Sequence, residues 1–292
     1  MLNPVPTLSK VPEGYRHIGV TPICGALGAE IDGIDLSADV SDDVLAEIRK
    51  ALNEYLVIFF RGQDLTPDQQ KAFGLRFGTL NIHPVYEPLP GHPEILQVVK
   101  EADALNNIGD TWHSDATFLP EPPMGSILYA REIPPFGGDT LFANLYLAYE
   151  MLTDGMRRML SSMNAVHSDA FLTQVNSERN ATRSTKLRGG QMEAKETVHP
   201  VVRTHPETGR KCLYVNEPFT VRFDGMSAAE SRPILDYLLA HIKRPEFTCR
   251  FRWQVGSIAF WDNRCTHHYA LNDYHGYRRE MHRVTVNGDR PY

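Results

Sequence analysis

The sequence predicts a mainly β protein with a few flanking helices, built as a sandwich or a barrel. Short strand-like runs alternate with turn residues over most of the 292-residue chain, and only a few stretches show helical spacing. Many short strands separated by turn signals are typical of sandwiches and barrels. No internal repeat, low-complexity tract or Ser/Gly-rich linker interrupts the chain, so we expect one domain over residues 1–292.

The N-terminal part combines strands with two helices. Glycines punctuate the opening apolar runs as they would at hairpin turns, and Ser41 stands as an N-cap before residues of helical spacing. Thr66 caps another helix, because Pro67 follows it and Gln69 completes a capping box. We therefore expect, in order, a hairpin over 18–34, a helix over 41–55, a buried strand over 56–60 and a helix over 66–77.

The rest of the chain is richer in strands. Helices are expected over 145–160 and over 226–242, where Ser227 and Glu230 form a capping box. The stretch 161–197 is polar and poor in strand-forming residues, and we interpret it as an insertion that acts as a lid. The strand predictions cover 95–99, 126–131, 198–204, 213–215, 247–253, 258–261 and 282–287.

Composition narrows the class of protein. The formal net charge of −6 and the absence of a Lys/Arg run argue against binding to nucleic acid. The 4 cysteines are scattered without a CxxC pair, which favours reduced thiols over a disulfide framework or a zinc cluster. The N-terminus lacks the apolar core of a signal peptide, and the apolar run Tyr55–Phe60 is too short to span a bilayer. We expect a cytoplasmic protein without a membrane partner.

The segment His113-Ser114-Asp115 carries the strongest chemical signal. On an extended segment, side chains two residues apart project from the same face, so the histidine and the aspartate can hold one metal ion while the serine points away. His267 or His268 would complete a triad of two histidines and a carboxylate; they are adjacent, so only one of them faces the metal. Three ligands leave coordination positions open, as a non-haem Fe(II) oxygenase requires and a closed structural zinc site does not.

Further motifs in the same order make the chain resemble the taurine dioxygenase family of Fe(II)/2-oxoglutarate-dependent dioxygenases. This family also includes alkylsulfatase-type and aryloxyalkanoate enzymes. The resemblance covers nearly the whole chain, from Gly28–Ile31 to Asp289, and it implies a double-stranded β-helix, or jelly roll, whose mouth holds the iron. The matching segments are Trp112–Asp115, Gly137–Thr140, His199–Pro206, Trp261–Arg264 and Arg278–Arg283.

The resemblance implies a role for individual residues of the centre. His113, Asp115 and His268 match the three Fe(II) ligands, so the second of the adjacent histidines is selected. Arg279 matches the arginine that holds the distal carboxylate of 2-oxoglutarate, and its planar fork suits that task. Thr140 matches a hydroxyl donor to the same carboxylate. The keto acid would bind the iron and leave a position for O2, the other cosubstrate.

The resemblance also implies a small anionic substrate. Arg283 matches the arginine that binds the sulfonate of taurine, and on a strand it shares a face with Arg279. His83, Tyr86 and Phe219 match substrate-contacting positions. The implied reaction is hydroxylation of a C–H bond of an alkylsulfonate such as taurine, or of an alkyl sulfate, with release of sulfite or sulfate. Because the family often forms homo-oligomers, we expect a homodimer or a homotetramer.

The sequence leaves alternatives open. Ile108–Asp110 and Arg250–Trp253 look closer to aryloxyalkanoate enzymes, which release a phenol. Outside the oxygenases, the same ligands could serve a zinc hydrolase or remain as a vestigial site in a non-catalytic jelly-roll binding protein. Some residues also have plainer structural interpretations: Arg283 as the partner of a carboxylate at the barrel rim, His83 as a packed core histidine, and Asp262 with Arg264 as a local pair.

Overall fold

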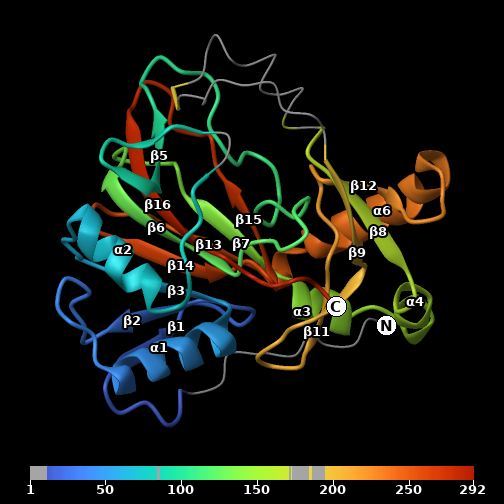
Figure 1. Ribbon diagram of the computed structural model, residues 1–292, viewed down its shortest axis with the longest axis horizontal. Helices are drawn as coiled ribbons and strands as arrows, with labels where there is room; N and C mark the ends of the chain where they lie inside the picture. Colours follow the sequence, from blue (N-terminus) through green and yellow to red (C-terminus); the bar gives the residue numbers. More distant parts are fainter. Residues whose placement is uncertain (1–11, 84–85, 171, 173–183, 186–194) are drawn as a thin grey trace.

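The fold is built around one large β-sheet. The computed structural model describes residues 12–83, 86–170, 172, 184–185 and 195–292 (Figure 1). Within these residues the larger sheet has eight strands, which pair antiparallel except for the parallel neighbours β2 and β3. In spatial order they are β1 (Gly19–Pro22), β2 (Ala29–Asp32), β3 (Val57–Phe60), β14 (Ile258–Asp262), β6 (Gly125–Glu132), β16 (Arg279–Val286), β5 (His92–Lys100) and β4 (Pro88–Leu89).

A smaller sheet faces the larger one and carries part of the site. It contains β13 (Thr248–Phe251), β7 (Thr140–Asn144) and β15 (Thr266–Ala270), with β7 in the centre. Phe59 of the larger sheet stacks on Phe251 with ring centroids 3.9 Å apart and meets Phe142 edge-on at 5.8 Å, so the two sheets share a core. This arrangement confirms the mainly β jelly roll. The remaining strands are β12 (Thr220–Phe223), β8 (Asn164–Ser168), β9 (Glu196–Pro200), β10 (Val202–Thr204) and β11 (Lys211–Leu213).

The central strands of the larger sheet are buried on both faces. Along β3, Val57 and Phe59 point into the core between the sheets, whereas Ile58 and Phe60 point into a second core on the outer face. Such a strand has no solvent-facing side, which explains why its sequence is an unbroken apolar run rather than an alternating one.

Two N-terminal helices cover that outer face, as Figure 1 shows. Ser41 caps α1 (Asp42–Tyr55), and Thr66 and Gln69 form the capping box of α2 (Pro67–Leu75), both as predicted. Burying the apolar side of each helix against the sheet completes the second core. The predicted capping box of Ser227 is also present, at the start of α6 (Ala228–Ile242). A 3-10 turn follows at Pro245–Phe247.

The prediction of one continuous helix over 145–160 is wrong. The chain forms α3 (Leu145–Glu150) and α4 (Asp154–Leu160) instead. Asn144 caps the first, and the Thr153 hydroxyl accepts a hydrogen bond from Met156 N to cap the second. The apolar spacing continues through the interruption, so periodicity alone did not reveal the new N-cap.

Several strand predictions also need correction. The strand predicted over 198–204 is divided at Val201 into β9 and β10, while β7, β12 and β15 were not predicted as strands. The proposed lid over 161–197 contains β8 at its start and the beginning of β9 at its end; most of the intervening part lies outside the described residues. Among the helices that the structure describes, none is long and apolar enough to cross a membrane.

Candidate active site

Three predicted ligands meet at one point of the jelly roll. Nε2 of His113 lies 3.8 Å from Oδ1 of Asp115, and Nε2 of His268 lies 3.9 Å from the same oxygen. One donor atom from each residue falls within 4.8 Å of the other two, a spacing that a single metal ion can bridge. All three side chains are buried.

Main-chain pairing places the two histidines side by side. His113 forms an isolated β-bridge with His268, through N–H···O bonds of 3.0 and 2.8 Å, and their rings lie 4.1 Å apart. The segment after His113 is not the strand that we considered; it turns, and Ala116 adopts a φ of 49°. Asp115 nevertheless reaches the same point. Ser114 points away as expected, and its hydroxyl donates to the Thr266 carbonyl at 2.7 Å.

The choice between the adjacent histidines follows from strand geometry. On β15, successive side chains alternate between faces, so only one can point to Asp115. His268 does so, and its ring packs at 4.7 Å from Trp261. His267 is equally buried but belongs to the opposite face of the strand.

Hydrogen bonds fix the tautomer of His113 and hold the carboxylate of Asp115. The Nδ1 of His113 lies 2.7 Å from the Thr111 carbonyl, which can only accept, so Nδ1 carries the proton and Nε2 keeps its lone pair for a metal. Ser126 donates to Oδ2 of Asp115 at 3.0 Å, and Arg283 donates to Oδ1 at 3.0 Å. Burial alone would raise the pKa of the Asp115 carboxyl, but Arg283 and the two histidines together lower it well below its ordinary value.

Asn263 is a site residue that the sequence did not reveal. Its side-chain oxygen accepts from the main-chain N–H of Asp115 at 2.6 Å, and its amide donates to the Asp115 carbonyl at 3.0 Å. The same amide also donates to the Pro123 carbonyl at 3.1 Å. Asn263 stands in the turn between β14 and β15, so it attaches the segment of one ligand to the segment of another. Its place in the motif Trp261–Arg264 was the available signal.

Arg279 fits the role of an anion receptor. It lies at the start of β16, its side chain is buried, and its Nε and NH2 groups have no hydrogen-bond partner within the described part of the chain. Burial lowers its pKa from the ordinary arginine value, because a guanidinium without an anion is poorly stabilised in the interior. Two free N–H donors on one planar fork match a carboxylate.

Thr140 lies on β7 with its hydroxyl already engaged by one donor. Trp253 Nε1 donates to Thr140 Oγ1 at 3.0 Å, so the threonine keeps its own proton for another acceptor. Thr140 pairs with Ala270, two residues beyond His268 on the same strand. Trp253 also lies beneath the Arg279 guanidinium, 5.8 Å from ring centroid to Cζ, so one indole contacts Arg279 with its face and Thr140 with its N–H edge.

One cavity joins two of the three predicted metal ligands to the predicted substrate residues. His113 and Asp115 line it together with His83, Tyr86, Phe219 and Arg283. Its walls are mostly apolar, with contributions from Ile108, Phe118, Leu119 and Pro218, and Leu172 of the predicted lid also reaches it. His83 accepts a hydrogen bond from Tyr86 N at 3.2 Å, and Phe219 packs edge-on against Phe118.

Arg283 serves the metal centre directly, which the sequence did not predict. We considered a plain carboxylate partner for it, and that carboxylate turns out to be the ligand Asp115. Its Nε is buried without a hydrogen-bond partner among the described residues, so the guanidinium retains a donor for a further anion. Asn81, Asn107 and Thr285 add polar groups to the cavity wall that were also missed.

A second group of potential ligands is a structural network instead. His205, Asp262 and Cys265 are buried with donor atoms within 4.8 Å of one another. However, both ring nitrogens of His205 are used: Nε2 lies 3.0 Å from Asp262, and Nδ1 accepts two main-chain N–H groups of the following turn. Arg264 donates to both carboxylate oxygens of Asp262, at 2.9 and 2.6 Å. The predicted local pair of Asp262 with Arg264 is therefore confirmed.

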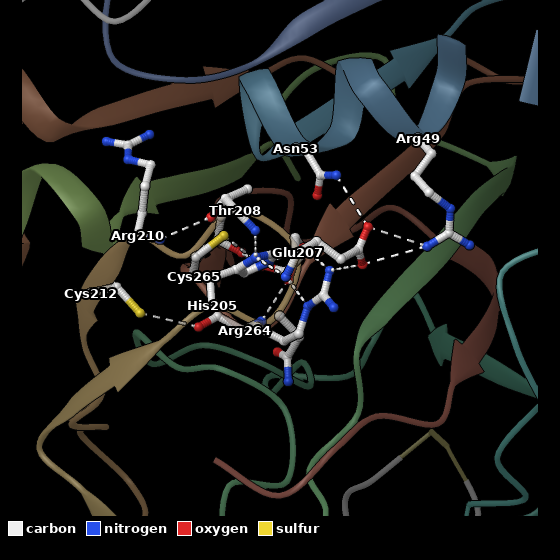
Figure 2. Close-up of polar contacts among 12 residues, drawn as sticks. Arg49, Asn53, His205, Glu207, Thr208, Arg210, Cys212, Arg264 and Cys265 are labelled. Atoms are coloured by element: carbon white, nitrogen blue, oxygen red, sulfur yellow. Dashed lines mark hydrogen bonds and ion pairs between the residues drawn. The ribbon is translucent and has the colours of Figure 1, made fainter. Parts of the chain in front are cut away.

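The same network reaches the N-terminal helix α1. Figure 2 shows Glu207 between Arg264 on one side and Asn53 and Arg49 of α1 on the other. The Arg264–Glu207 contact is 2.8 Å and the Asn53–Glu207 hydrogen bond is 3.1 Å. Because every member has a partner, these residues connect α1 to the turn that carries Asn263 rather than offering an open site.

Comparison with known proteins agrees with this geometry. The family model described as "Taurine catabolism dioxygenase TauD, TfdA family" matches residues 19–285. An α-ketoglutarate-dependent sulfate ester dioxygenase of Pseudomonas putida is 36% identical over 284 residues, covering 94% of this chain and 91% of that protein. An alkylsulfatase of Acinetobacter baylyi is also 36% identical, covering 94% of this chain and 86% of that protein. The 2,4-dichlorophenoxyacetate dioxygenase of Cupriavidus pinatubonensis is 33% identical, with coverages of 92% and 97%.

Solved structures show the same fold. A putative α-ketoglutarate-dependent taurine dioxygenase from Burkholderia xenovorans superimposes with a TM-score of 0.81 at 39% identity, covering 94% of both chains. The structure of AAD-2 in complex with Mn(II) and N-oxalylglycine superimposes with a TM-score of 0.74 at 28% identity, covering 94% of this chain and 98% of that one.

Proposed function

Because the chain belongs to the TauD, TfdA family of taurine catabolism dioxygenases, we propose that it is an Fe(II)- and 2-oxoglutarate-dependent enzyme acting on a small alkyl sulfate ester or alkylsulfonate. The observation that carries this proposal is the combination of an open three-ligand centre with the buried guanidinium of Arg279, whose Nε and NH2 groups find no hydrogen-bond partner among the described residues. A hydrolase would use the same three ligands but would leave that arginine without an anion.

The residues present fit the iron and its cosubstrate. His113, Asp115 and His268 would hold Fe(II), and Arg279 with Thr140 would bind the distal carboxylate of 2-oxoglutarate. When bound, iron with 2-oxoglutarate and O2 supplies the oxidising power for C–H hydroxylation, and the keto acid leaves as succinate and CO2. The protein orients the reactants: the His113 proton stays on Nδ1, Asp115 stays ionised, and apolar walls exclude water.

The cavity suits an anion attached to an apolar chain. Of the lining residues that the structure describes, Arg283 is the cation, and Phe118, Leu119 and Phe219 supply apolar contact. Hydroxylation of the carbon that bears the sulfate oxygen gives a hemiacetal-like sulfate ester. That product collapses when the hydroxyl proton leaves, the C=O bond forms and the C–OSO3 bond breaks, so an aldehyde and sulfate result. An alkylsulfonate gives an aldehyde and sulfite by the same sequence.

The cellular setting belongs to the same proposal. We place the enzyme in the cytoplasm, which is supported by its cysteines being free of disulfides: Cys24, Cys212, Cys249 and Cys265. We also propose that residues 1–292 act as one catalytic domain within a homodimer or homotetramer. The expected partner is a small organic anion, since the net charge of −6 disfavours nucleic acid.

A substrate panel tests the proposal. Fe(II)-loaded protein receives 2-oxoglutarate, air and one of four substrate types: taurine, longer alkylsulfonates, alkyl sulfates or phenoxyalkanoates. We expect succinate formation to be stimulated by an alkyl sulfate or alkylsulfonate, with an equal amount of sulfate or sulfite. Stimulation only by a phenoxyalkanoate, with phenol release, would transfer the assignment to the aryloxyalkanoate class, which the relative from Cupriavidus pinatubonensis represents.

The role of Arg283 in binding the substrate anion can be tested in the same assay. Replacing Arg283 with methionine removes the N–H donors of the guanidinium, including the one that contacts Asp115. Lysine keeps the positive charge but lacks the planar, forked guanidinium. We expect Arg283→Met to raise the KM for the sulfate ester more than tenfold, and Arg283→Lys to recover part of that loss. An unchanged KM in both variants would show that another group binds the anion.

A further inference from the structure

Two buried cations stand directly opposite each other at one end of the site. In the register of β5 and β16, Lys100 pairs with Arg279. Further along the same strands Leu96 pairs with Arg283, and Leu96 packs in a small cluster with Tyr86 at the substrate cavity. Because side chains two apart on a strand share a face, Lys100 lies on the face of β5 that Leu96 presents to the site.

Lys100 is buried in a way that is unusual for a lysine. Its residue is 3% exposed, and its Nζ has no hydrogen-bond partner within the described part of the chain. Its Nζ lies over the ring of Tyr274, 4.4 Å from the ring centroid. Burial lowers the pKa of this amine, which shows that its charge is poorly compensated by its surroundings.

The strand beside Lys100 is covered rather than open. Thr185 Oγ1 accepts from Val99 N at 3.0 Å and donates to the Val99 carbonyl at 3.0 Å. Ser184 Oγ accepts from Glu101 N at 2.9 Å. The edge of β5 on both sides of Lys100 is therefore occupied by two residues of the insertion.

No carboxylate of the described residues forms an ion pair with either Lys100 or Arg279. Asp139 attracts Arg279 electrostatically, but its carboxylate accepts a hydrogen bond from Arg250 at 2.6 Å. Like charges directly opposite each other on neighbouring strands destabilise a sheet, and buried ones more so. Such a pair is stabilised when an anion lies between the cations or against both.

We propose that Lys100 is a second cationic residue for the distal carboxylate of the cosubstrate, acting beside Arg279. The inference rests on the proposed function, because 2-oxoglutarate supplies the carboxylate. Tyr274 connects the two cations. Lys100 Nζ lies over its ring, and a Cβ on Gly138 would lie 3.2 Å from that ring and 3.4 Å from Arg279, so the ring that Lys100 contacts also lies close to Arg279. One carboxylate between two cations is held more tightly than by a single arginine.

The test separates the distal carboxylate from the rest of the ligand. Binding of 2-oxoglutarate and of 2-oxopentanoate, which lacks the distal carboxylate, is measured by calorimetry to Mn(II)-loaded protein without O2. Four proteins are compared: wild type, Lys100→Met, Lys100→Arg, and the surface variant Lys71→Met, whose residue forms an ion pair with Asp68.

We expect Lys100→Met to weaken 2-oxoglutarate binding by on the order of tenfold while leaving 2-oxopentanoate binding unchanged. Lys100→Arg should keep most of the affinity, and Lys71→Met should behave as wild type. Equal losses for both ligands, or no loss for either, would overturn the proposal and leave Lys100 as a support for Tyr274. If Lys100→Met does not fold, Lys100→Gln takes its place in the binding measurements. The thermal shift that each ligand causes in wild type and in Lys100→Arg then also shows whether Lys100 contributes to binding of the distal carboxylate. Failure of the wild-type protein to bind 2-oxoglutarate would instead contradict the proposed function.

Discussion

At the residue scale, the metal centre depends on side chains that bind no metal. Asn263 accepts a hydrogen bond from Asp115 N and donates one to the Asp115 carbonyl, so a residue of the later segment fixes the main chain of the earlier one. Ser126 of β6 donates a hydrogen bond to the carboxylate of Asp115. Groups that orient metal ligands in this way commonly change metal affinity by roughly tenfold to hundredfold.

Replacing Asn263 with alanine is therefore expected to weaken Fe(II) binding by roughly tenfold or more, because Asp115 loses its main-chain anchor. The measurement is a competitive metal titration without O2. Asn272→Ala is the matched control, since that amide donates to the Leu105 carbonyl away from the cavity. An unchanged metal affinity for Asn263→Ala would show that Asp115 is held well enough by its carboxylate contacts.

His167 gives a prediction about acid stability. It is fully buried against Thr117, and burial, helped by His199, lowers its pKa from 6.5 to about 3. Below about pH 6.5 the imidazole of His167 therefore binds a proton in the unfolded chain but stays neutral in the folded protein. The folded protein consequently loses stability as the pH falls from 6.5 toward 3. Between pH 6.5 and 4.5 this one residue accounts for roughly 2–3 kcal/mol.

Urea unfolding at those two pH values measures the effect. His167→Gln should lose less stability between them than wild type, by about that amount, whereas the exposed-site variant His275→Gln should follow wild type. If His167→Gln shows the same loss as wild type, other groups are responsible for the acid sensitivity.

Functional residues could be predicted where they stand a short, regular distance apart in the sequence. His113 and Asp115 stand two apart, and strand alternation made His267 and His268 mutually exclusive, so the ligand set followed once the family resemblance selected His268. The motif Trp261–Arg264 marked Asn263, but its contact with Asp115 could not be predicted, because the two residues are 148 positions apart. Lys100 gives no local signal either; its significance arises from the register that places it opposite Arg279.

At the scale of elements, the close approach of β6 and β14 supports the turn that carries Asn263. Gly125 begins β6 and pairs with Asp262 at the end of β14. A Cβ at this position would lie 2.5 Å from the Trp261 carbonyl, so any larger residue has to push the strands apart. Asp262 would move with the strand, and with it the contacts to His205 and Arg264, two residues that Figure 2 labels.

Gly125→Ala is expected to destabilise the fold by about 1–3 kcal/mol through this overlap. Gly155→Ala is the control, because it lies inside α4 and an added Cβ meets nothing within 4 Å; it should be neutral or stabilising by up to about 1 kcal/mol. Thermal unfolding of both variants measures the difference. Equal stability of the two variants would show that β6 can shift without cost.

Elements with their own end signals were predictable. The caps Ser41, Thr66 and Ser227 identified three helices, because the N-cap side chain satisfies a main-chain donor locally. The strands β7 and β15 were missed because both are buried and defined by pairing with each other, not by an alternating pattern. Thr153 was missed as a cap since the apolar spacing continues across it.

At the scale of the whole molecule, the site lies where two sheets and the insertion meet. The doubly buried strands β3 and β14 separate the inner core from the core under α1 and α2. Figure 1 shows these helices on the side of the larger sheet away from the smaller one. The strand content predicted the class of fold, but the order β3-β14-β6-β16-β5 joins segments that are distant in sequence and follows only from the folded structure.

The organic product of an alkyl sulfate tests the account most directly. Fe(II)-loaded protein with 2-oxoglutarate and air is given hexyl sulfate, and the six-carbon product is identified together with succinate and sulfate. We expect hexanal, succinate and sulfate in equal amounts, and no reaction when 2-oxoglutarate or O2 is omitted. Release of hexanol and sulfate without either cosubstrate would contradict it, because the three ligands would then be serving hydrolysis.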